Sequence, residues 1–179
     1  MNYLLPLLSV LIGYVFALVF QPKDKAKLKL LLAFSGSFLL SLTVSHLLPE
    51  IYESNNNRIG LFIMVGILFQ IILEYFSQGA EHGHVHGHDK MNHIPWLLFI
   101  SLCIHALAEG FPVAHNHDLA IGIAIHHLPI AIILTTFFIN ANLDKKAIFL
   151  FMVTFAIMTP LGTILSDYLP LLNVYYTEI

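Results

Sequence analysis

Six long apolar stretches constrain this chain more than any other feature, because they leave little room for anything else in 179 residues. A bilayer core about 30 Å thick needs roughly 20 apolar residues per helix, and each stretch is about that long. The connections between the stretches are too short to hold a soluble domain. The sequence therefore predicts an all-α, polytopic membrane helix bundle that forms a single domain over residues 1–179. The predicted spans are residues 4–20, 30–51, 59–77, 95–114, 119–139 and 147–166.

The composition excludes several classes of function. Hydrophobic residues make up 58% of the chain and charged residues only 11%, far from the values of soluble proteins. A net charge of −3 leaves no basic surface for phosphates, so nucleic-acid binding is excluded. The single cysteine, Cys103, excludes an internal disulfide and any paired-cysteine zinc or redox motif. Metal chemistry would have to use His, Asp and Glu, and eleven histidines in so apolar a chain point that way.

The positive charges predict the orientation of the chain. Successive connections between the spans lie on alternate sides of the membrane. Seven of the eight basic residues fall on one side, and only Arg58 falls on the other. By the positive-inside bias, the amino terminus is outside and the connection at residues 78–93 is cytoplasmic. The first stretch has no positive residue ahead of it and reads as a retained helix, not a secretory signal. We expect a multi-pass protein of a cell membrane, either a plasma membrane or a bacterial inner membrane.

Two histidine–glutamate pairs lie inside the predicted spans. His46 and Glu50 are four residues apart on the second stretch, and His105 and Glu109 are four apart on the fourth. This spacing puts both members of a pair on one helix face, and an imidazole beside a carboxylate is half of a divalent-metal site. Each pair taken alone could equally neutralise itself by a hydrogen bond. The first pair is the weaker candidate, because Glu50 lies at the outer end where water reaches it.

A further pair of histidines, His126 and His127, lies near the middle of the fifth stretch. Adjacent residues on a helix point about 100° apart. At most one of the two can therefore share a tightly packed site with the fourth stretch, unless Pro129 distorts the turn.

The connection at residues 78–93 is rich in histidine. A tract of alternating histidines of this kind is typical of metal binding, but without fixed geometry it is poorly selective. Its histidines, at alternate positions, are His82, His84, His86 and His88.

Two other features predict structure and need no metal. Asp118 is placed to cap the fifth helix at its amino end. Ser37, Ser41 and Ser45 repeat every four residues, and this small-residue stripe predicts a close contact with a neighbouring helix.

Several segments together resemble the ZIP (Zrt/Irt-like) family of divalent metal transporters. Ser35–Glu50 resembles the second helix of that family, and the histidine-rich connection after the third stretch is typical of it. His105–Gly110, with the sequence HALAEG, is similar to the fourth-helix pattern HNxPEG. The segment IAIHHLPIA from Ile123 resembles the fifth-helix pattern, and TPLG at Thr159–Gly162 resembles the sixth helix.

The resemblance implies a metal site between the fourth and fifth helices, with departures. His105, Glu109 and His126 keep ligand types at matching positions, while His127 occupies the position of an Asn, Asp or Glu ligand. Ala106 replaces an Asn of the family pattern, and Ile130 replaces a Glu that bridges two metals. One bound metal is therefore expected where family members often hold two. A site richer in imidazole than in carboxylate favours Zn²⁺ over harder ions such as Mn²⁺.

The predicted function is transport of a divalent transition metal, zinc above others, from outside into the cytoplasm. The ion would arrive near His115 and His117, bind at the mid-membrane site and leave towards the histidine-rich connection. Expected partners are the metal ion, the lipid bilayer and a second copy of the chain in a homodimer. The family usually has eight helices, so the six here imply a fragment or a short form completed by association. Two alternatives are a metal-dependent intramembrane hydrolase and a non-transporting metal-binding membrane protein.

Overall fold

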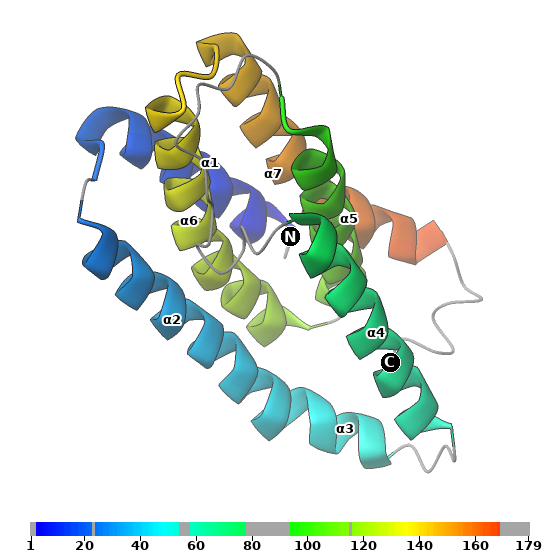
Figure 1. Ribbon diagram of the computed structural model, residues 1–179. Coiled ribbons are helices and arrows are strands. Elements are labelled where there is room, and N and C mark those ends of the chain that lie inside the picture. The colour runs from blue at the N-terminus through cyan, green and yellow to red at the C-terminus, as the bar shows by residue number, and fades with distance from the viewer. Residues whose placement is uncertain (1–2, 23, 54–57, 78–93, 115, 169–179) are drawn as a thin grey trace.

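The computed structural model describes residues 3–22, 24–53, 58–77, 94–114 and 116–168, and every regular element in these ranges is a helix (Figure 1). The predicted histidine-rich loop lies outside the described residues. In chain order the elements are α1 (Leu4–Phe20), α2 (Lys25–Leu42), the π-helical turn η1 (Thr43–Leu47), α3 (Leu48–Glu53), α4 (Ile59–Ser77), α5 (Trp96–Val113), α6 (His117–Asn140) and α7 (Lys145–Tyr168).

Five helices in the described part of the chain are long and apolar enough to cross a membrane. One of them is continuous through α2, η1 and α3, from Ala26 to Glu53. The shorter α1 has 17 residues and so extends about 26 Å, close to the thickness of a bilayer core. The prediction of an all-α, polytopic membrane bundle is confirmed.

Short polar side chains cap the starts of α2 and α6. The Asp24 carboxylate accepts hydrogen bonds from the backbone N–H groups of Lys27 and Ala26 at the start of α2. These bonds, that of Lys27 above all, hold the pKa of Asp24 below its usual value. At the start of α6 the cap is Asn116, whose side chain accepts from the N–H of Leu119 at 2.9 Å. The prediction that Asp118 caps this helix is wrong, because the cap lies two residues earlier and Asp118 is within the first turn of the helix.

The widened turn η1 interrupts the long helix one turn before Pro49. Proline has no N–H, so it cannot donate to the carbonyl four residues earlier, that of Ser45. In η1 the helix shifts to longer-range bonding, and the N–H of Leu48 donates to the carbonyl of Thr43. Wide turns of this kind are frequent at functional sites.

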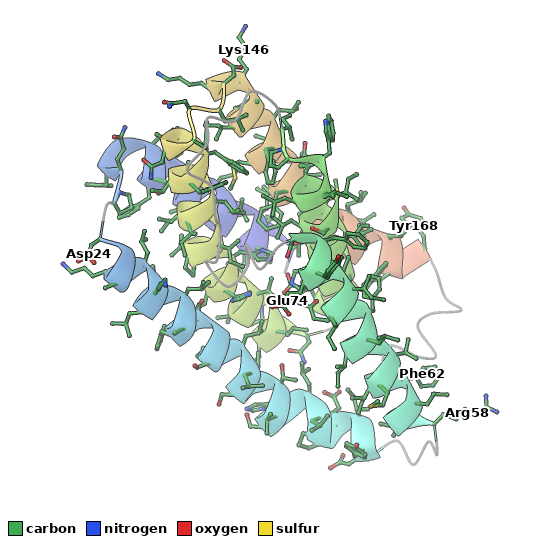
Figure 2. The ribbon with its side chains drawn as sticks, viewed as in Figure 1. Asp24, Arg58, Phe62, Glu74, Lys146 and Tyr168 are labelled. Carbon is green, nitrogen blue, oxygen red and sulfur yellow. The ribbon has the colours of Figure 1, made fainter. Side chains whose placement is uncertain are left out.

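Four helices, α1, α5, α6 and α7, pack together as an inner bundle, while α2 lies against α6 and α4 against α5 (Figure 1). The core of the inner bundle is apolar, and its fully buried side chains include Leu102, Ala106, Leu134, Phe138 and Phe151. Lys146 and Arg58 lie at opposite ends of the molecule (Figure 2). Most of the buried apolar side chains lie in the inner bundle, and α2 and α4 flank it.

Two glycines allow α5 and α7 to touch through their backbones. A Cβ added at Gly110 would lie 2.2 Å from the carbonyl oxygen of Thr159, and one at Gly162 would lie 2.1 Å from that of Leu107. The hydroxyl of Thr163 lies 2.9 Å from the carbonyl oxygen of Gly110, to which it donates across this contact. Close approach through small residues is the usual way in which helices associate in lipid. This crossing fixes the position of Glu109, the neighbour of Gly110.

The predicted close helix contact at the serine stripe is not found among the described residues. Ser37, Ser41 and Ser45 are exposed. The Ser45 hydroxyl donates to the carbonyl of Ser41 at 2.6 Å, one turn earlier on its own helix. Such a bond satisfies a serine inside a helix without any partner helix.

Candidate metal site

Three ionisable side chains meet between α5 and α6. His105 and Glu109 come from α5, and the imidazole Nε2 of the first lies 3.3 Å from Oε1 of the second. His127 comes from α6, and its Nε2 lies 2.7 Å from Oε2 of Glu109. The two imidazoles thus approach opposite oxygens of one carboxylate. We call this group the mid-membrane trio.

Residue spacing on α5 and packing against α7 together position the trio. His105 and Glu109 share a face of α5 because they are one turn apart. His127 is only 1% exposed, and its ring packs against Phe155 of α7 with 5.3 Å between the ring centroids. Because an unpaired carboxylate in such surroundings would be costly, the imidazole partners account for the presence of Glu109 inside the bundle.

The trio in this conformation is hydrogen-bonded. Among the described residues, no group of three or more His, Cys, Asp or Glu side chains is arranged to hold a metal ion. Ligands bound tetrahedrally at about 2.0–2.1 Å from Zn²⁺ are about 3.3 Å from one another. The contact between His105 and Glu109 already has that separation, whereas the 2.7 Å contact of His127 is a direct hydrogen bond. A metal would need the two helices to separate slightly at His127.

The 2.7 Å contact with Glu109 is made by His127, the neighbour of His126. The His126 side chain is half-buried, and its ring centroid lies 6.4 Å from that of His127. The family resemblance matches His126 with a ligand, but the structure brings its neighbour to Glu109. The one-residue difference reflects the 100° step between adjacent positions on α6.

The other predicted pair lies apart from the trio. His46 and Glu50 are both exposed, on η1 and α3. His46 lines a groove of about 350 Å³ together with Asp118 of α6, and Glu50 does not line it. Sequence reasoning did not associate Asp118 with His46, because 72 residues separate them along the chain and no periodic pattern links them. The predicted loop ligands His82, His84, His86 and His88, and His115, lie outside the described residues.

Fold and site together define a polytopic membrane helix bundle with a His–Glu–His cluster inside it. The chain is similar to a protein of Danio rerio named Zinc transporter ZIP1, with 26% identity over 110 residues. The similarity covers 48% of this chain and 36% of that protein's length, so the chain spans about a third of its relative. No family model matches the chain, and no solved structure matches it.

Proposed function

We propose that this chain carries a divalent transition metal ion, Zn²⁺ in preference to harder ions, across a cell membrane through the mid-membrane trio. The observation that carries the proposal is the half-buried Glu109 carboxylate held between imidazoles from two different helices. Ionisable groups inside a membrane protein are costly and commonly mark ion pathways. The sequence motifs and the relative named as a zinc transporter support the same assignment.

The chemistry of the trio suits a borderline metal such as zinc. Neutral imidazole nitrogens and a carboxylate oxygen are its usual ligands beside thiolate, and a softer ligand set than all-oxygen disfavours Mg²⁺, Ca²⁺ and Mn²⁺. The ion would exchange the two His–Glu contacts for metal–ligand bonds and would release any proton shared along them. Three protein ligands leave the fourth position of a tetrahedral ion open to water, and this is the position at which ligands can exchange.

Two features suggest how the trio could be loaded and emptied. Its ligands come from α5 and α6, and a small relative movement of these helices changes the spacing at His127 more than that at His105. Pro112 and Pro129 interrupt the backbone bonding of the same two helices, three residues beyond Glu109 and two beyond His127. Freed carbonyls at such points are tolerated where they line a cavity, and they add oxygen ligands along a path.

The distribution of basic residues supports an orientation of the chain, and with it the inward direction proposed for transport. With seven of eight Lys and Arg on one set of connections, the amino terminus would be outside and the histidine-rich loop cytoplasmic. Zinc would then move inward and meet that loop on arrival. In this arrangement residues 1–179 act as a single transport domain.

The proposal is tested by zinc flux into proteoliposomes that contain the full chain and a trapped fluorescent zinc indicator. We expect flux in the parent and its loss in the His105→Ala, Glu109→Ala double variant. Glu53→Gln is the matched control, because it removes an exposed carboxylate at the end of α3 and should leave flux unchanged. Size-exclusion profiles establish that the variants are folded. Equal flux in parent and double variant would overturn the assignment of the trio. Binding of zinc without flux would favour the metal-binding alternative.

A further inference from the structure

A groove lies between the long helix formed by α2 and η1 and the start of α6, which run beside one another (Figure 1). Its volume of about 350 Å³ is enough for about ten water molecules at roughly 30 Å³ each. Both walls carry apolar and polar side chains. The lining residues are Phe38, Ser41, Leu42, Ser45, His46, Asp118 and Ile121.

The Asp118 carboxylate is available in this groove. The capping role at the start of α6 is filled by Asn116, so Asp118 is not required there. Within the part of the chain that the structure describes, its side chain has no hydrogen-bond or ion-pair partner, and it is exposed. Because this side chain lies at the start of α6 and is exposed, water and cations can reach it.

Facing Asp118, the widened turn η1 contributes His46 and Ser45. The Ser45 hydroxyl uses its proton on the Ser41 carbonyl, which leaves its oxygen able to accept or coordinate. Carboxylate, imidazole and hydroxyl together suit a divalent cation that keeps several of its waters. Two strong protein ligands in a wide, open groove would hold such an ion weakly and release it readily.

The groove is separate from the mid-membrane trio. Asp118 and His127 are nine residues apart on α6, which puts them on opposite faces of the helix and about 14 Å apart along its axis. His126 is about 80° from Asp118 around the helix, between the two faces. A change in the groove should therefore leave the trio intact.

We propose that His46 and Asp118 form a capture site where a hydrated divalent cation is first held before it reaches the trio. This inference rests on the proposed transport function. A capture site raises the local concentration of the ion, so its loss changes the concentration at which transport saturates and not the maximal rate.

The test is zinc flux into proteoliposomes as a function of external Zn²⁺ concentration. We expect the His46→Ala, Asp118→Asn double variant to raise the half-saturating concentration by about tenfold, equivalent to about 1.4 kcal/mol, with a maximal flux within about twofold of the parent. Glu53→Gln controls for the general loss of negative charge, because it removes an exposed carboxylate elsewhere on the surface. An unchanged half-saturating concentration in the double variant would overturn the capture site, while flux in the parent would still uphold transport.

Direct binding decides the matter if the parent shows no flux. Zinc is titrated into the detergent-solubilised full chain that carries His105→Ala and Glu109→Ala and has alanine at the four loop histidines. A remaining weak site that Asp118→Asn removes and Glu53→Gln does not would uphold the capture site although transport had failed. No difference between those two variants would overturn it.

Discussion

The inner bundle and the flanking helices are built from equally apolar sequences, yet they differ sharply in burial. α4 and α7 have the same mean hydropathy, but 11% of the span in α4 is buried against 50% in α7 and 61% in α6. In lipid, hydropathy takes a helix into the membrane but does not decide which helices pack together. Close packing, and with it the position of the half-buried Glu109 carboxylate, depends on small residues and on shape.

Glycine shows the difference most clearly. At Gly66 of α4 a Cβ would meet nothing within 4 Å, whereas at Gly110 and Gly162 it would collide with backbone. The same residue type is a packing requirement in the inner bundle and dispensable in a flanking helix. Because Glu109 adjoins Gly110, the close packing of α5 against α7 also sets the position of the trio.

We expect the largest loss of stability when a methyl group is added where α5 and α7 cross. Gly162→Ala should destabilise the protein by about 3 kcal/mol, because the added Cβ meets the Leu107 carbonyl oxygen and the backbones of α5 and α7 must separate. Gly66→Ala should leave stability unchanged within about 0.5 kcal/mol. Thermal unfolding in detergent, followed by circular dichroism, measures both. Similar thermal midpoints for the two variants would contradict the difference in packing between the inner bundle and the flanking helix α4.

A second test removes the same side-chain atoms from each region. Leu134 in α6 is fully buried, and Leu134→Ala should cost about 2 to 4 kcal/mol through the cavity that it leaves. Leu68 in α4 is 59% exposed, and Leu68→Ala should cost less than about 0.5 kcal/mol. The same unfolding assay compares them, and a loss as large at Leu68 as at Leu134 would mean that α4 has a packed partner.

Within the inner bundle, the two adjacent histidines of α6 are a matched pair. His127→Ala should reduce zinc flux at least about tenfold, or about 1.4 kcal/mol, because it removes a partner of Glu109. His126→Ala should reduce flux by less than about threefold, because the 2.7 Å contact with Glu109 is made by His127. Initial flux rates in proteoliposomes decide between them. The reverse order would favour the ligand set implied by the family resemblance.

The smallest expected effect is at the start of a flanking helix. Asp24→Ala should fray the first turn of α2 and lower the thermal midpoint slightly, whereas Asp24→Asn keeps an accepting oxygen and should not. Because the folded-state pKa of Asp24 is depressed, its charged contribution is present above the unfolded pKa of about 3.9 and is lost as pH falls through the folded value. Hydrogen exchange of the first α2 amides at neutral and at acid pH measures it. Equal exchange in Asp24→Ala and the parent at neutral pH would contradict the capping role.

The sequence predicted the helices well because hydropathy and length are local properties. The predicted spans 59–77 and 4–20 coincide with α4 and α1, and the others differ by a few residues at their ends. Helix starts were less predictable, since Asn116 and Asp118 are both good caps and only the observed backbone selects between them. The turn η1 could not be read from composition, although Pro49 is its local cause.

The candidate site was predictable as far as single helices reach. The spacing of His105 and Glu109 fixes their common face, and the 100° step on α6 limits the site to one of its two histidines. Which of the two faces Glu109 depends on the rotation of α6 against α1 and α2, which no local pattern encodes. For the same reason the sequence did not bring Asp118 and His46 to one groove.

The central claim is that one zinc ion binds tightly at the mid-membrane trio. Its most direct test is a zinc titration of the detergent-solubilised chain with alanine at His82, His84, His86 and His88, compared with the same chain carrying Glu109→Gln or Glu53→Gln. We predict one tight Zn²⁺ per chain in the parent, its loss in Glu109→Gln and its retention in Glu53→Gln. A tight site that persists in Glu109→Gln would contradict the account.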